Sequence, residues 1–211
     1  LAILAGCTSP ASSSPSAKAL ARLPPTGFVP VEGGRVWYEV HGKGTGTPLL
    51  VLHGGPGIPH DYLANLALLG DERPVVFYDQ LGCGQSDRPD DPALWTRERF
   101  ARELAAVRAA LGLDDVVLYG HSWGSLLAVD YLSGRGGERP PGVRGAILAG
   151  PALSLPRWMA DSRRLMATLP PEVEQAIQEG ERTGQTETEA FKAATQVYYR
   201  NFVCRADPWP A

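Results

Sequence analysis

Short runs of apolar residues recur along the first part of the chain, and amphipathic stretches separate them. Four of these runs are almost entirely apolar, at residues 48–52, 74–78, 116–119 and 143–148. Such runs are typical of strands that are buried on both faces of a parallel sheet. Because helices cover a sheet of this kind, the alternation predicts an α/β fold with a mostly parallel sheet and helices on both faces.

The clearest helix is predicted over residues 96–111, where the apolar residues are spaced to form one stripe. Thr96 is the expected N-cap of this helix, and Gly112 is its expected stop. A second helix is predicted over residues 123–132, directly after the third apolar run. Both helices would connect consecutive strands of the sheet.

A hairpin and a short helix complete the predicted core, which we place at residues 26–151. The β-rich segments 27–31 and 35–41 flank two glycines and therefore predict the hairpin. The short helix is predicted over residues 60–69, with its apolar side formed by Tyr62, Leu66 and Leu69.

The pattern changes in the last quarter of the chain. Residues 156–200 are amphipathic at helical spacing and contain no strand-like run. Three helices are expected there, at residues 158–169, 172–178 and 187–201. Two prolines at 170 and 171, and Gly180, are the expected breaks between them. We interpret residues 152–211 as an incomplete helical cap that is inserted after a strand of the core.

The first 25 residues differ in composition from the rest. Leu4-Ala5-Gly6-Cys7 resembles a bacterial lipobox, in which the cysteine becomes the lipidated first residue of the mature protein. Residues 8–25 are rich in Ser, Pro and Ala, which predicts a tether. We therefore expect secretion across the cytoplasmic membrane, with a lipid anchor on Cys7, at the periplasmic or cell surface.

Composition and charge exclude several classes of partner. The 211 residues carry a formal net charge of -3, so the basic patch that nucleic-acid binding requires is not expected. No run of about 18 apolar residues could span a bilayer, so membrane attachment would come only from the lipid. Cys83 and Cys204 could pair in an oxidising compartment, but two free buried thiols are favoured. The sequence does not indicate the oligomeric state.

The segment Gly120-His121-Ser122-Trp123-Gly124 matches the Gly-x-Ser-x-Gly motif. It follows an apolar run and precedes a predicted helix, which is the setting of a nucleophile elbow. In such an elbow the two glycines allow a tight strained turn that raises the serine hydroxyl above the sheet. We therefore predict Ser122 as a nucleophile; the alternative is a serine that only caps the helix.

The segment His53-Gly54-Gly55-Pro56-Gly57 follows the first apolar run. A serine nucleophile needs backbone amides that stabilise the oxyanion of the tetrahedral intermediate. One comes from the residue after the nucleophile, here Trp123, and the other from a loop after an earlier strand, here Gly55. A phosphate-binding loop is not supported because no Gly-Lys-Ser/Thr follows.

The order of the catalytic residues raises a difficulty. In this arrangement the serine is followed by an acid and then by a histidine, yet all four histidines lie at or before position 121. Asp79 precedes Ser122 and is expected to shape its own loop. None of the three aspartates after Ser122 follows a predicted strand; they are Asp130, Asp161 and Asp207. No residue after Ser122 is therefore expected to serve as the acid or the histidine of a triad.

Three motifs together resemble the proline iminopeptidases of the α/β-hydrolase fold. They are His53-Gly54-Gly55-Pro56-Gly57, the segment Asp79-Gln80-Leu81-Gly82-Cys83-Gly84-Gln85-Ser86, and Gly120-His121-Ser122-Trp123-Gly124-Ser125. Residues 198–205 and 208–210 resemble the cap of the tricorn-interacting type of that family. The resemblance implies an exopeptidase that releases N-terminal residues, often proline, from short peptides. It implies no metal and no organic cofactor. It also implies about 60–90 further residues that carry the acid and the histidine.

Two other functions remain open. A general esterase, lactonase or amide hydrolase could use the same fold, because a fold does not fix a substrate. A non-catalytic binding protein or pseudoenzyme would have no need for the intact elbow. An epoxide hydrolase or dehalogenase is disfavoured, because those relatives carry Asp at the position of Ser122.

Overall fold

The computed structural model describes residues 13–138, 140–151 and 153–208. The chain forms two compact units, Leu1–Leu153 and Ser154–Ala211. Cys7 and the expected lipobox lie outside the described residues, so the lipid anchor stays a prediction. None of the described helices is both long and apolar enough to cross a membrane.

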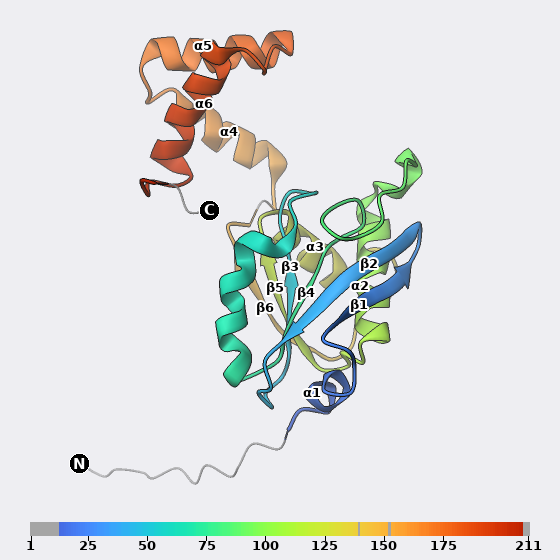
Figure 1. The fold of residues 1–211 in the computed structure, drawn as a ribbon. Helices are drawn as coiled ribbons and strands as arrows, with labels where there is room; N and C mark the ends of the chain where they lie inside the picture. Colours follow the sequence, from blue (N-terminus) through green and yellow to red (C-terminus); the bar gives the residue numbers. More distant parts are fainter. Residues whose placement is uncertain (1–12, 139, 152, 209–211) are drawn as a thin grey trace, which may run out of the picture. The chain divides into compact units, whose positions relative to one another are not determined.

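The first unit is built on a six-stranded mixed sheet with the order β1-β2-β4-β3-β5-β6 (Figure 1). Its strands are β1 Thr26–Val31, β2 Gly34–His41, β3 Leu49–Leu52, β4 Val75–Tyr78, β5 Val116–His121 and β6 Val143–Ala149. The hairpin β1–β2 joins β4 in antiparallel fashion. The strands β4, β3, β5 and β6 run parallel to one another. The predicted mostly parallel sheet and its hairpin are confirmed.

Helices cover both faces of this sheet. Alternate residues of each central strand point to opposite faces, so each face has its own set of strand residues. One face packs under α2, Arg97–Ala110, and α3, Trp123–Leu132. Its strand residues include Leu50, Leu52, Val76, Tyr78, Val116 and Leu118. The other face packs under η1, His60–Asp71. Its buried strand residues are Leu49, Val51, Val75 and Phe77.

The ends of α2 are as the sequence predicts. The hydroxyl of Thr96 accepts a hydrogen bond from the Arg99 amide at 3.2 Å, which satisfies one of the free amides of the first turn. Gly112 follows the helix with φ of 64°, a left-handed conformation that favours glycine. The short 3-10 helix η2, Pro92–Leu94, precedes α2.

The segment η1 differs from the predicted short helix. It is a 3-10 helix, in which residues three apart lie on one side. Accordingly His60 and Leu63 are buried and Leu66 packs beside them. Tyr62 and Leu69 are 41% and 37% exposed, so of the three residues expected on the apolar side only Leu66 packs against the core.

The expected tether also differs from the structure over part of its length. Residues Pro15–Leu20 form a short helix, α1. Ala17 and Leu20 are buried, and the Ser16 hydroxyl accepts a hydrogen bond from the Asp115 amide at 2.9 Å. The packed region therefore begins before Thr26. A helix of six residues is too short to show a periodic apolar pattern, which is why the sequence did not reveal it.

The second unit contains the three expected helices, α4 Leu155–Met166, α5 Pro171–Thr183 and α6 Glu189–Phe202. Met166, Ile177 and Ala194 form its small core. The described residues of this unit contain no strand. Gly180 does not break a helix as expected: it lies inside α5, where a Cβ would approach the Phe191 ring to 2.2 Å. The helix ends instead at Gly184, with φ of 72°.

Candidate active site

The candidate residues lie at the carboxyl ends of three neighbouring strands. His53 follows β3, Asp79 follows β4, and Ser122 follows β5. Because β4, β3 and β5 are parallel neighbours, these ends meet at the same edge of the sheet. The chain passes from β3 to β4 on one side and later places β5 on the other side. Ligands of open α/β sheets bind at such a switch in strand order.

Ser122 occupies a strained turn between β5 and α3. Its φ is 52° and its ψ is -114°, and it is the one non-glycine residue with positive φ in the described part of the chain. Strain of this kind costs roughly 1–3 kcal/mol and is found mainly at functional sites. The side chain makes no capping hydrogen bond to α3, so the alternative of a simple capping serine is not supported.

The glycines on either side of Ser122 are required by close packing. A Cβ on Gly120 would lie 2.4 Å from the Gly124 carbonyl oxygen. A Cβ on Gly124 would lie 2.0 Å from the Leu52 carbonyl oxygen and 2.8 Å from that of His53. Helix α3 therefore rests directly on the end of β3, and this contact places the elbow beside the loop that follows β3.

Replacing Gly124 with alanine should consequently destabilise the protein. The new methyl group meets backbone rather than a flexible side chain, so we expect a loss of about 3 kcal/mol, at the upper end of typical overpacking. Urea denaturation measures the change. Gly145→Ala is the matched control, since a Cβ there meets nothing within 4 Å. Equal midpoints for the two variants would contradict the close approach of α3 to β3.

The loop of residues 54–57 lies against the elbow. A Cβ on Gly54 would lie 3.2 Å from Nδ1 and 3.3 Å from the carbonyl oxygen of His121, the residue before the nucleophile. Gly55 is exposed and has φ of 114°, a conformation that other residues rarely adopt. Gly57 also has positive φ, 96°. The loop therefore brings the Gly55 amide, expected to hold the oxyanion, to the side of the sheet where Ser122 lies.

Trp123 supplies the second expected amide. It is the first residue of α3, so its N–H has no acceptor within the helix and lies at the positive end of the helix dipole. The indole is fixed separately: Nε1 donates a hydrogen bond to Oε1 of Gln80 at 2.9 Å, and the ring meets Phe100 edge to face. The side chain therefore anchors the residue whose amide is left for an oxyanion.

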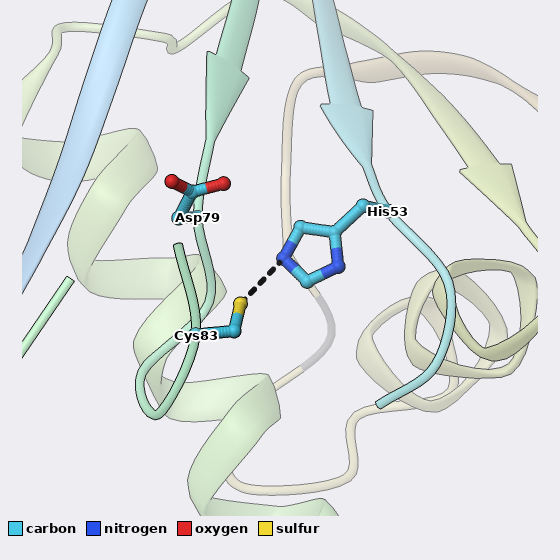
Figure 2. Close-up of side chains that lie close together, drawn as sticks. All are labelled: His53, Asp79 and Cys83. Atoms are coloured by element: carbon cyan, nitrogen blue, oxygen red, sulfur yellow. Dashed lines mark hydrogen bonds between the residues drawn. The ribbon is translucent and has the colours of Figure 1, made fainter. Parts of the chain in front are cut away.

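His53, Asp79 and Cys83 form a buried cluster (Figure 2). One ligand atom from each lies within 4.8 Å of the others, the spacing of a possible metal site. However, Nδ1 of His53 is 2.9 Å from the Gly54 carbonyl, and Nε2 accepts from the Gln80 amide. Burial raises the pKa of the Cys83 thiol to about 12, whereas a metal ligand must be a thiolate. These contacts favour a structural role, and both Cys83 and the half-buried Cys204 are free.

Asp79 shapes its own loop, as the sequence predicts. One carboxylate oxygen lies 2.8 Å from Nδ1 of His60, and the other accepts from the Gln85 amide at 2.9 Å. Burial alone would raise the pKa of Asp79, but these hydrogen bonds outweigh burial and lower it. The hydrogen bond to Asp79 also raises the pKa of His60, whose ring stacks on Trp37. The carboxylate is therefore fully engaged in holding the loop.

Tyr62 makes a second link between the loop and the elbow, which the sequence did not reveal. Its hydroxyl accepts a hydrogen bond from the Gly54 amide at 2.8 Å and lies 2.8 Å from Nδ1 of His121. A hydroxyl that accepts one hydrogen bond can donate another, so Tyr62 can donate to an unprotonated Nδ1 of a neutral His121 ring. Burial lowers the pKa of His121 and favours that neutral form. His121 therefore supports the loop.

Two of the three aspartates after Ser122 have other partners. Asp130 lies in α3 and binds Arg97 at 2.6 Å and Arg135 at 2.9 Å. Asp161 lies in α4 beside Arg164. Residues 123–211 contain no histidine. The described residues therefore place Ser122 next to Trp123 and beside the loop that contains Gly55, but they bring no acid or histidine in triad order to the site.

A separate cavity of about 630 Å³ lies away from this site. Its lining comes from α1, from residues 40–45 and from Pro74, which precedes β4. It is therefore at the amino end of the parallel strands, opposite the elbow. Nothing in its lining contributes to the nucleophile or to the Gly54–Gly57 loop.

A raised serine on a strand–turn–helix elbow, at the carboxyl edge of a mostly parallel sheet, defines the α/β-hydrolase class. A family model described as alpha/beta hydrolase fold matches residues 47–210. A proline iminopeptidase from Heyndrickxia coagulans is 45% identical over 185 residues, which cover 87% of this chain and 63% of that protein. The chain belongs to the family of the alpha/beta hydrolase fold, and within that fold it is similar to the proline iminopeptidases.

Solved structures agree with this assignment. The proline iminopeptidase of Mycobacterium smegmatis has a TM-score of 0.78 at 34% identity, with 88% of this chain and 63% of that chain covered. The crystal structure of VinJ has a TM-score of 0.82 at 38% identity, with coverage of 89% and 64%. The chain thus spans less than two thirds of the length of these relatives.

Proposed function

We propose that the protein is a serine exopeptidase that releases N-terminal residues, preferentially proline, from peptides. The observation that carries the proposal is Ser122, held at positive φ on the elbow beside the Gly54–Gly57 loop. The relatives named proline iminopeptidase give the substrate class. A small peptide is the expected partner.

In the proposed reaction the Ser122 oxygen attacks the carbonyl carbon of the first residue of the peptide. Its proton passes to a general base, and the carbonyl oxygen becomes an oxyanion held by the amides of Gly55 and Trp123. The intermediate then collapses, the peptide amine leaves with a proton, and an acyl group remains on Ser122. Water releases that acyl group in a second, equivalent step. The base and its acid are not among residues 123–211 in the order that this fold uses.

A substrate panel tests the proposal. The complete gene product should hydrolyse proline anilide with a kcat/KM at least about tenfold above that for a blocked proline anilide or an aryl acetate. A preference for the ester would instead support a general esterase, and turnover of neither would support a non-catalytic protein. The polypeptide of these 211 residues alone should be slower by about a thousandfold or more, because it offers no histidine base. Rapid turnover by that polypeptide would contradict the assigned mechanism.

A further inference from the structure

We propose that Gln80 is a positioning residue that sets the geometry of the oxyanion hole by holding both of its amides. This inference rests on the proposed function as a serine hydrolase. Gln80 follows β4, and in the strand order β4-β3-β5 the loop after β3 comes between Gln80 and the elbow after β5. It is 1% exposed.

One arm of the arrangement runs through His53. The Gln80 side-chain amide donates to the His53 carbonyl at 3.0 Å, and the Gln80 backbone amide donates to Nε2 of His53 at 2.9 Å. Because Nε2 accepts, the ring proton is on Nδ1, which donates to the Gly54 carbonyl at 2.9 Å. The Gly54 carbonyl and the Gly55 N–H belong to the same planar peptide. Fixing that carbonyl therefore fixes the direction of the Gly55 N–H.

The other arm runs through Trp123. The indole Nε1 donates to Oε1 of Gln80 at 2.9 Å. An indole can only donate, and a backbone carbonyl can only accept, so the two ends of the Gln80 amide can occupy this site in one orientation. The same side chain thus links His53, two residues before Gly55, to Trp123. The distance between the two oxyanion amides depends on a single planar group.

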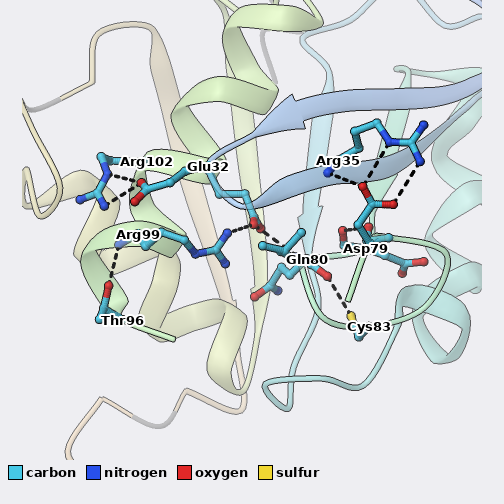
Figure 3. Close-up of polar contacts among 12 residues, drawn as sticks. Glu32, Arg35, Asp79, Gln80, Cys83, Thr96, Arg99 and Arg102 are labelled. Atoms are coloured by element: carbon cyan, nitrogen blue, oxygen red, sulfur yellow. Dashed lines mark hydrogen bonds and ion pairs between the residues drawn. The ribbon is translucent and has the colours of Figure 1, made fainter. Parts of the chain in front are cut away.

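The backbone of Gln80 is itself held firmly. Its carbonyl accepts from the Cys83 thiol at 3.2 Å, and the next amide, that of Leu81, donates to Glu103 at 3.3 Å. Figure 3 shows Gln80 and Cys83 joined by this bond. The side-chain amide of Gln80 offers a donor and an acceptor together. Methionine matches its size but offers neither, so Gln80→Met isolates the hydrogen bonds.

The test compares Gln80→Met with Ser86→Ala in the complete gene product, using an aryl acetate and proline anilide. Ser86 is the matched control: it lies in the same loop, is buried, and bonds to Trp37 and Asp79 instead. We expect Gln80→Met to lower kcat about 10–100-fold with KM within about threefold, since oxyanion contacts act in the transition state. A boronic acid that forms a tetrahedral adduct with the serine should bind correspondingly more weakly, whereas free proline should bind as before. Ser86→Ala should keep kcat within about threefold of the original, even if its melting temperature falls.

The same experiment separates failure of this inference from failure of the proposed function. If the original protein hydrolyses the ester but not proline anilide, the peptidase proposal fails and the Gln80 comparison proceeds on the ester. A kcat for Gln80→Met within about threefold of the original, or a parallel loss in Ser86→Ala, overturns the positioning role. If Gln80→Met does not fold, Trp123→Phe removes the indole donor together with part of the ring, and should still lower kcat and boronate affinity together. If neither substrate reacts, the amide resonance of Gly55 and the indole resonance of Trp123 decide: both must move in Gln80→Met, and unchanged resonances overturn the inference.

Discussion

Replacing Ser122 with alanine is expected to lower hydrolysis by the complete gene product by about 10⁴-fold or more, as the loss of a serine nucleophile does in other serine hydrolases. Without the hydroxyl no acyl-enzyme can form, and only binding and the oxyanion amides remain. The strained backbone at Ser122 does not depend on the side chain, because the turn is held by the Ser122 amide, which donates to the Ala149 carbonyl at 2.9 Å. The variant should therefore fold as the original does. Initial rates with proline anilide or an aryl acetate measure the loss.

The matched control for this prediction is Ser133→Ala, at the other end of the same helix. The Ser133 hydroxyl donates to the Asp130 carbonyl at 2.9 Å and takes no part in the site. We expect its rate to stay within about threefold of the original. A fluorophosphonate, which reacts only with activated serines, should label the original protein and Ser133→Ala but not Ser122→Ala. Equal rates for all three proteins would show that hydrolysis does not pass through Ser122.

The elbow could be predicted from the sequence because its signals are local. Gly120, Ser122 and Gly124 lie within five residues, and the strand and helix that flank them have clear patterns. The sheet was predictable for a similar reason: strands buried on both faces are continuous apolar runs. Thr96 and Gly112, at the two ends of α2, also follow local capping rules.

The supports of the site could not be predicted in this way. Gln80 meets His53 from 27 positions away and Trp123 from 43 positions away. Tyr62 meets His121 across 59 positions. A glutamine or tyrosine at a strand end or on a short helix carries no pattern of its own, so its partner is fixed only when the strands pair. The motif Asp79–Ser86 marked this segment as important but did not show which side chain faces the elbow.

A pair of charges was equally hidden in α2. Arg99 stands at a capping-box position that usually holds Glu, and the sequence did not show that it is buried with Glu103. Figure 3 shows Arg99 reaching from α2 toward the loop that contains Gln80. One nitrogen of Arg99 lies 2.5 Å from Glu103, and the two side chains are 1% and 0% exposed. Among the described residues, Nε and Nη2 of Arg99, Oε1 of Glu103 and the Tyr78 hydroxyl are buried without a hydrogen-bond partner.

This incomplete pairing predicts opposite results for single and double replacements. Arg99→Met leaves Glu103 buried without its partner and should lower the free energy of unfolding by about 3–5 kcal/mol at pH 8. The double variant with Arg99→Met and Glu103→Leu has neither charge. Its free energy of unfolding should be close to that of the original protein, or higher by up to about 4 kcal/mol. Arg102 lies on the same helix as Arg99 and forms an exposed ion pair with Glu32. Arg102→Met should lower the free energy of unfolding by no more than about 1 kcal/mol. Urea denaturation at fixed pH measures all three.

The pH dependence provides an independent check of the same prediction. Burial raises the pKa of Glu103 from 4.5 to about 7, although Arg99 and the Leu81 amide oppose part of the rise. Between these two values the folded state binds more protons than the unfolded state, so the contribution of Glu103 to stability is full below pH 4.5 and is lost as the pH rises through about 7. Removing Arg99 raises the pKa of Glu103 further, because its opposing charge is gone. The cost of Arg99→Met should therefore be smaller at pH 5, where Glu103 is neutral, than at pH 8. In the double variant this dependence of the stability change on pH should disappear. If Arg99→Met lowered the free energy of unfolding equally at both pH values, Glu103 would not be the group left unpaired.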